Sequence, residues 1–256
     1  MGGLRFNPSD FQITHLTVSV HNLHNAFNGF RIVHISDIHM GQWMSLDRLE
    51  GVVGLVNEQH PDVVAITGDF VSFTIDPVVA DLKSSLARLR PKEVTLAVLG
   101  NHDHWMGAAK VCRVLNESSI ITLSNDVYTL RKEDGALNFA GVDDVMAHAD
   151  DLGQVLKKLP SSDPVILLVH EPDFADISSA TSRFVLQLSG HSHGGQFVLP
   201  WIGPPFHGAY FKKYPIGEYR VNNMTLYTNR GLGANTVWLR INCPPEITVV
   251  TLNAVH

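Results

Sequence analysis

Residues 30–39 read Phe30-Arg31-Ile32-Val33-His34-Ile35-Ser36-Asp37-Ile38-His39. The first six form a short, largely apolar run, which is typical of a strand buried in a core. Asp37 and His39 follow at the point where this strand is expected to end. The combination of an apolar strand with an acid or imidazole side chain directly after it recurs along the chain.

Four further apolar segments end in the same way. The predicted strands at 63–66, 94–99, 165–169 and 184–188 are followed by Gly68-Asp69, Gly100-Asn101-His102-Asp103, His170-Glu171 and Gly190-His191-Ser192-His193. Helices are predicted over 46–59, 76–90, 107–118 and 150–159, where apolar residues recur at helical spacing or capping residues occur. Strands that alternate with helices indicate a layered α/β fold.

Six further segments are predicted to be strands. They lie at 12–20, 127–131, 136–142, 217–221, 224–228 and 246–252. The chain shows no internal repeat, low-complexity tract or linker, so we expect one domain over residues 1–256.

Composition excludes several classes of protein. The 256 residues are 45% hydrophobic, and 25 acidic against 19 basic side chains give a net charge of −6, which disfavours a general nucleic-acid binder. No apolar run approaches the roughly 18 residues that span a bilayer. The N-terminus shows no secretory signal, so a cytoplasmic location is expected for the chain as sequenced, and a leader removed beforehand remains the alternative. The two cysteines match no zinc or disulfide framework.

The polar clusters are expected to gather at one edge of the sheet, because ligands bind at the carboxyl ends of strands in open α/β sheets. Carboxylate and imidazole side chains suit Mn, Fe or Zn, and the set also accommodates Mg. Two aspartates and four or more histidines exceed the needs of one tetrahedral zinc. They suit two divalent ions about 3.5–4 Å apart, an arrangement that serves phosphoryl transfer.

The ordered pattern Asp-x-His, Gly-Asp, Gly-Asn-His-Asp, a lone His and Gly-His-x-His resembles the calcineurin-like metallophosphoesterase family. The resemblance covers nearly the whole chain. Gly194-Gly195-Gln196, Arg230-Gly231-Leu232-Gly233 and Asn242-Cys243-Pro244-Pro245-Glu246 are similar to a bacterial branch whose members often carry an N-terminal membrane segment or export signal. The resemblance implies a four-layer αββα sandwich with two mixed sheets.

The resemblance also implies a role for each motif residue. One metal would be held by Asp37, His39 and His193, the other by Asn101, His170 and His191, with Asp69 bridging both. His102 would protonate or stabilise the leaving oxygen. The implied reaction is hydrolysis of phosphodiester or related phosphate ester bonds by a metal-bound hydroxide.

One departure disfavours a protein phosphatase. Serine/threonine phosphatases of this superfamily continue Gly-Asp into a stretch that ends Asp-Arg-Gly, whereas this chain reads Gly68-Asp69-Phe70-Val71-Ser72-Phe73. The acid and the phosphate-clamping arginine expected there are absent from the sequence. Asp103 would orient His102 instead, or cap the following helix.

Substrate contacts are predicted for His104 and Arg230, with a helix-start contact and a carbonyl cap as their respective alternatives. The loop after the last histidine pair carries many aromatic side chains and two lysines, namely Phe197, Trp201, Phe206, His207, Tyr210, Phe211, Lys212, Lys213 and Tyr214. It would contact a nucleobase, a lipid chain or the membrane surface, or else form a small satellite core.

Three other functions stay open from the sequence. The first, in the same class, is a pyrophosphatase of a lipid-linked nucleotide such as UDP-2,3-diacylglucosamine, acting at the membrane surface. The second is a metal-poor scaffold that binds partners, although the chain retains every metal-ligand residue that the resemblance implies. The third, a nuclease, is disfavoured by the acidic balance. The sequence leaves the oligomeric state open.

Overall fold

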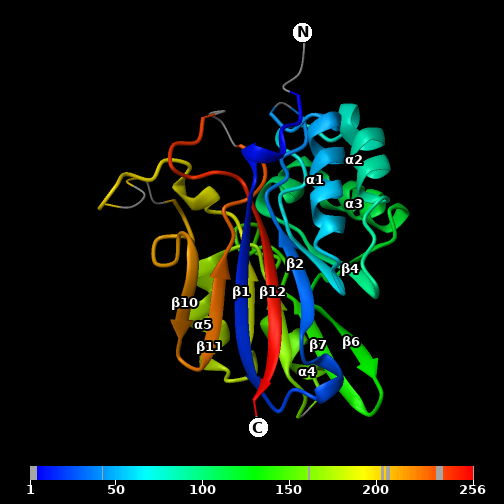
Figure 1. Cartoon of the computed structure of the whole chain (residues 1–256), viewed down its shortest axis with the longest axis vertical. Coiled ribbons are helices and arrows are strands. Elements are labelled where there is room, and N and C mark those ends of the chain that lie inside the picture. The colour runs from blue at the N-terminus through cyan, green and yellow to red at the C-terminus, as the bar shows by residue number, and fades with distance from the viewer. Residues whose placement is uncertain are drawn as a thin grey trace.

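The computed structural model describes residues 5–41, 43–160, 162–202, 205, 208–234 and 239–255. Its strands form two six-stranded sheets that mix parallel and antiparallel pairs (Figure 1). The first sheet has the order β1-β12-β2-β3-β4-β5, with bounds Gln12–His21, Glu246–Val255, Phe30–Ile35, Val63–Thr67, Val94–Val98 and Ile120–Thr122. In this sheet β12 runs antiparallel to β2, and the other neighbours are parallel.

The second sheet has the order β10-β11-β9-β8-β7-β6, with bounds Gly217–Val221, Met224–Thr228, Leu186–Ser189, Val165–Leu168, Gly135–Gly141 and Asp126–Lys132. The four central strands are parallel, and each edge strand pairs antiparallel with its neighbour.

Helices cover the outer face of each sheet. The helices α1 (Leu46–Glu58), α2 (Val79–Leu86) and α3 (Asn101–Glu117) pack on the first sheet, and α4 (Leu152–Lys158) and α5 (Ala175–Ala180) pack on the second. Short 3₁₀ helices lie at Pro8–Asp10, Asn25–Phe27, Asp76–Val78, Pro172–Phe174 and His193–Gly195. The predicted four-layer αββα sandwich is confirmed.

Three buried clusters fill the spaces between the four layers. Within β3, Val63 and Ala65 face the second sheet, whereas Val64 and Ile66 face the helices. Because both faces of the strand are covered, its first four positions are all apolar, and this explains the unbroken apolar run at 63–66 in the sequence.

Two predicted helices differ from the observed ones by three or more residues at one or both ends. The helix expected over 76–90 is a 3₁₀ turn at Asp76–Val78 followed by α2, which ends at Leu86. The chain leaves the helix because the Arg90 N–H donates to the Asn57 side chain at 2.8 Å and Pro91 follows.

The helix predicted from 107 begins six residues earlier, at Asn101. The Asp103 carboxylate accepts the Gly100 N–H at 3.0 Å and thereby satisfies a donor at the helix start. Gly107, with φ of 114°, interrupts regular helical geometry near the predicted start. The strand β5 and the helix α5 were not predicted, because both are too short to show a period.

Among the described residues, no helix is both long enough and apolar enough to span a membrane.

Candidate metal centre

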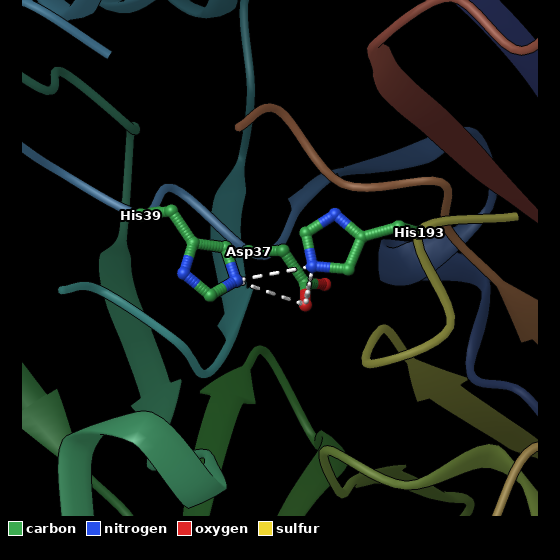
Figure 2. Close-up of side chains that lie close together, drawn as sticks. All are labelled: Asp37, His39 and His193. Atoms are coloured by element: carbon green, nitrogen blue, oxygen red, sulfur yellow. Dashed lines mark hydrogen bonds and ion pairs between the residues drawn. The ribbon is translucent and has the colours of Figure 1, made fainter. Parts of the chain in front are cut away.

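Asp37, His39 and His193 form a buried cluster (Figure 2). The Nε2 atoms of the two imidazoles lie 3.0 Å apart. Asp37 Oδ1 lies 3.3 Å from Nε2 of His193 and 3.9 Å from Nε2 of His39. The other Asp37 oxygen accepts the His191 N–H at 3.0 Å, which leaves Oδ1 directed at the two rings. Two nitrogen donors and one carboxylate oxygen therefore converge on one point.

The loops after β2 and β3 hold this cluster through backbone contacts. The Asp37 N–H donates to the Gly68 carbonyl and the His39 N–H donates to the Asp69 carbonyl, both at 2.9 Å. Asp37, His39 and Asp69 all have positive φ values, between 48° and 56°. Non-glycine residues in this region are strained, and such strain concentrates at functional sites.

Asp69 lies between two histidines that follow strands of different sheets, His39 after β2 and His170 after β8. Its Oδ2 atom is 3.4 Å from Nε2 of His39 and 3.4 Å from Nε2 of His170. Its Oδ1 atom accepts the His102 N–H at 2.9 Å. Burial alone would raise the pKa of Asp69, but the nearby His170 and His39 rings hold that pKa well below its usual value. The group therefore stays an anion that faces both sides of the site.

His170 is oriented by its other ring nitrogen. Its Nδ1 donates to the Thr67 carbonyl at 2.6 Å, which leaves Nε2, 3.4 Å from Asp69 Oδ2, as the ring atom available to a metal. Burial opposes protonation of this ring, but the charge of Asp69 raises the pKa of His170 well above its usual value. The buried side-chain atoms of this region that have no hydrogen-bond partner in the described structure include Asp37 Oδ1, Asn101 Oδ1 and His170 Nε2. Buried polar atoms without partners are costly, and all three are metal-ligand types. The residues therefore fit a divalent metal.

His191 adjoins this array, with its ring 4.9 Å from that of His170. Its Nε2 donates to the Ala209 carbonyl at 3.0 Å, so Nδ1 is the ring atom left to act as a ligand. Burial and the charge of His170 lower the pKa of His191 to about 4. Burial, with the charges of His39 and Arg240, likewise holds the pKa of His193 well below its usual value. Both rings are therefore neutral near pH 7, as ligation requires.

His102 lies in the first turn of α3 and faces the cluster. Its Nδ1 donates to the Ser72 carbonyl at 2.7 Å, and its ring packs edge-on to that of His39 at 4.8 Å. The predicted orienting role of Asp103 is corrected by this contact, since Ser72 holds the ring. Asp103 instead accepts the N–H groups of Asp69, Phe70 and Gly100 at 2.9–3.0 Å. Burial and the charge of Asp69 raise the pKa of Asp103 to about 7.

The two predicted substrate contacts have other partners in the structure. Nε2 of His104 lies 2.7 Å from Asp143 Oδ1. Nε of Arg230 donates to Glu246 at 2.7 Å, and its Nη1 donates to Gln12 at 3.1 Å. Neither side chain lines the pocket described next. Sequence alone could not show that each polar group meets a partner from a distant segment.

A pocket of about 560 Å³ opens over the cluster. Its polar floor consists of Asp69, Asn101, His102, His191, Ser192 and His193, and its walls include Phe73, Trp105, Met146, Gln196, Phe197 and Phe211. No lysine or arginine is among the described residues that line it. Of the predicted aromatic loop, Phe197 and Phe211 line the pocket, Trp201 is fully exposed, and Phe206 and His207 lie outside the described residues.

Arg240 supports the centre and was missed from the sequence. Its guanidinium donates to the carbonyls of Arg230 at 2.8 Å, Gly231 at 3.3 Å and Gly233 at 3.1 Å. An Nη2 atom of the same group lies 3.3 Å from Nδ1 of His193. The Gly233 N–H in turn donates to the Asp37 carbonyl at 2.7 Å. The only sequence signal for this loop was the Arg-Gly-Leu-Gly run at 230–233, which did not point to Arg240 as its partner.

Comparison with known proteins agrees with this geometry. A model of the family "Calcineurin-like phosphoesterase" matches residues 30–195. The chain is 34% identical over 255 residues to the uncharacterized metallophosphoesterase YkuE of Bacillus subtilis, covering 97% of this chain and 88% of that protein. It is 31% identical over 232 residues to the phosphodiesterase YaeI of Escherichia coli, covering 87% and 82%.

Solved structures share the fold at low sequence identity. The sulfate thiohydrolase SoxB of Thermus thermophilus matches with a TM-score of 0.53 and 11% identity, over 80% of this chain and 52% of that one. A 5′-nucleotidase precursor of the same organism matches with a TM-score of 0.52 and 14% identity, over 79% and 49%. With its buried cluster of metal-ligand side chains, the chain belongs to the calcineurin-like phosphoesterase family and is a metallophosphoesterase, a hydrolase of phosphate esters.

Proposed function

We propose that the chain hydrolyses phosphodiesters at a dinuclear metal centre built around Asp69. The observation that carries this proposal is the position of Asp69 Oδ2, 3.4 Å from both His39 Nε2 and His170 Nε2. A carboxylate can contact two cations at once, whereas each neutral imidazole offers one lone pair. One ion would be held by Asp37, His39 and His193, and the other by Asn101, His170 and His191, with Asp69 between them.

The donor set restricts the metal. It consists of carboxylate, imidazole and amide groups without a thiolate, which suits Mn, Fe or Zn and also accommodates Mg. When bound, two such ions lower the pKa of a coordinated water and neutralise charge on the phosphoryl oxygens.

His102 supplies the proton for the departing oxygen. Because Nδ1 is held by the Ser72 carbonyl, Nε2 is the ring atom that can carry and release a proton towards the pocket. The backbone N–H of the same residue donates to Asp69, and this hydrogen bond fixes the position of the proton donor relative to the central carboxylate.

The charge of the pocket favours a diester over a monoester. No described lining residue is a lysine or arginine, so the metals would supply the cationic charge there. A diester carries a single negative charge, whereas a monoester is largely a dianion above its second pKa of about 6. The apolar walls also offer surface for the second ester group.

The test compares bis(p-nitrophenyl) phosphate with p-nitrophenyl phosphate after reconstitution with Mn²⁺. We expect two metals per chain and a higher kcat/KM for the diester. Asp69→Asn and His102→Ala each lower kcat about 100-fold or more. His15→Ala, on the exposed side of β1, serves as the control and keeps full activity. Unchanged turnover in both site variants would refute the proposal.

A second candidate is a nucleotide-lipid pyrophosphatase that acts on a substrate such as UDP-2,3-diacylglucosamine at the membrane surface. It is favoured by the exposed apolar side chains of Leu199, Trp201 and Ile202, which follow the pocket residue Phe197. It is opposed by the lack of a described cationic side chain for a second phosphoryl group. Equal turnover of this substrate with and without its acyl chains in detergent would exclude it.

A further inference from the structure

We infer that the pocket has two subsites that bind different parts of the substrate. Trp105 and Phe73 bind the leaving group, and Phe211 binds the ester group that stays on phosphorus. This assignment rests on the proposed diesterase function. It is based on which aromatic rings contact His102 and which contact His191.

The first subsite adjoins His102. The Trp105 ring lies 4.8 Å and the Phe73 ring 6.4 Å from the His102 ring, centroid to centroid. Trp105 comes three residues after His102 in α3, which places both on one face of the helix. Phe73 follows Ser72, whose carbonyl holds His102. Both aromatic rings are thus fixed to the elements that position the proton donor.

These two rings present open apolar surface. Trp105 is 56% exposed and Phe73 is 50% exposed, and both line the pocket. Exposed aromatic rings in a concave site are typical of surfaces that bind planar or apolar groups.

The second subsite adjoins His191. The Phe211 ring lies 5.4 Å from the His191 ring, which lies 4.9 Å from that of His170. The segment around Phe211 is held at both sides, because Ala209 accepts from His191 and the Lys212 N–H donates to Asp173 at 2.8 Å. Asp69 lies between His39, which touches His102, and His170, which touches His191. The subsite of Trp105 and Phe73 therefore lies on the His39 side of Asp69, and the subsite of Phe211 lies on the His170 side.

The chemistry decides which subsite receives which group. In hydrolysis of a diester, a bond forms between the water oxygen and phosphorus, and the bond from phosphorus to the leaving oxygen breaks. The leaving oxygen takes a proton from His102, and the attacking water gives up a proton that restores His102 through solvent. The products are a monoester and an alcohol. Because the leaving oxygen must lie within reach of His102 Nε2, its substituent meets Trp105 and Phe73, and the retained group extends towards Phe211.

Three substrates separate the subsites. Methyl p-nitrophenyl phosphate and phenyl p-nitrophenyl phosphate share a leaving group and differ in the retained group. Methyl 2,2,2-trifluoroethyl phosphate keeps the methyl group and replaces the aromatic leaving group by a small alkyl one. Ratios of kcat/KM between variant and wild type cancel the intrinsic reactivity of each substrate.

We expect Trp105→Ala to lower kcat/KM about tenfold for both p-nitrophenyl substrates and to leave the trifluoroethyl substrate almost unchanged. Trp105→Phe restores most of the loss. Phe211→Ala removes the preference for phenyl over methyl without distinguishing the leaving groups. Ile177→Ala on α5, where the side chain is also 56% exposed, is the matched control and changes nothing.

An equal loss on all three substrates in Trp105→Ala, or an exchange of the two patterns between Trp105 and Phe211, would overturn the assignment. Wild-type protein that hydrolyses none of the three diesters would instead refute the proposed function, so the two failures are distinguishable.

Discussion

Gly231 packs directly against Asp37: a Cβ atom placed on Gly231 would lie 2.6 Å from the Cβ of Asp37. Gly231 also has φ of +71°, and its loop donates from Gly233 to the Asp37 carbonyl. The loop that follows β11 thus forms one wall behind a candidate metal ligand. Its backbone shape should govern metal binding, although none of its side chains belongs to the proposed ligand set.

Gly231→Ala should weaken metal binding about 10–100-fold, because the new methyl group displaces Asp37. Gly29→Ala is the control, since Gly29 has φ of +78° but nothing within 4 Å of the added Cβ. Both variants lose roughly 1–2 kcal/mol of stability from the left-handed backbone. Metal retained after dialysis against a graded chelator, together with urea unfolding, separates the two effects. Equal retention by both variants would contradict the role of the close approach.

Arg240→Met should release metal more readily and lower the free energy of unfolding by about 3 kcal/mol, because it leaves buried carbonyls of the supporting loop without donors. Arg240→Lys should recover only part of both losses, since an ammonium cannot reproduce the planar fork that reaches Arg230, Gly231 and Gly233. Arg220→Met, at an exposed position on β10, is the control. Metal release is followed with a chromogenic chelator. Full recovery by lysine would show that only the charge matters.

Asp103→Asn should destabilise the fold by about 2 kcal/mol and lower kcat. The amide has one acceptor oxygen where the carboxylate has two, so at least one of the three N–H groups of Asp69, Phe70 and Gly100 loses its acceptor. Because Asp69 then shifts, the loss of activity should exceed the loss of folded protein. Asp150→Asn, at an exposed position, should change neither quantity. Chemical unfolding and initial rates at saturating metal measure both, and a normal kcat in folded Asp103→Asn would contradict the expectation.

The His104–Asp143 pair should make stability depend on pH. The hydrogen bond from His104 to Asp143 raises the pKa of His104 above its usual 6.5. Although burial opposes it, the same bond lowers the pKa of Asp143 below 3.8. The contribution of His104 is therefore fully present below pH 6.5 and is lost as the pH rises through the higher folded-state value.

His104→Gln should accordingly be about 1 kcal/mol less stable than wild type at pH 5.5, and the difference should be smaller at pH 9. Urea unfolding at both pH values, with metal concentration held constant, tests this. A difference of equal size at both pH values would show that charge on His104 is irrelevant.

The fold and the central cluster could be predicted because both depend on local patterns. Strands covered on both faces are largely apolar, and their carboxyl ends collect at one edge, so the residues after β2, β3 and β8 were expected to meet. The structure places Asp37, Asp69 and His170 within reach of one another, as expected.

The supporting residues could not be predicted in the same way. Ser72 holds His102 through its carbonyl group, which every residue type possesses. Arg240 likewise donates to backbone carbonyl groups of the loop at Arg230 and Gly233, and the sequence gives no sign of these contacts. Arg230 and His104 carry chemically suggestive side chains, yet each meets an acid from a distant segment, Glu246 and Asp143. Such pairings depend on tertiary packing, for which one sequence holds no signal.

Anomalous diffraction from crystals grown with Mn²⁺ tests the dinuclear centre most directly. Two peaks about 3.5–4 Å apart are expected, with Asp69 between them. One should contact Asp37, His39 and His193, and the other Asn101, His170 and His191. A single peak, or a pair of peaks that Asp69 does not join, would contradict the proposed centre.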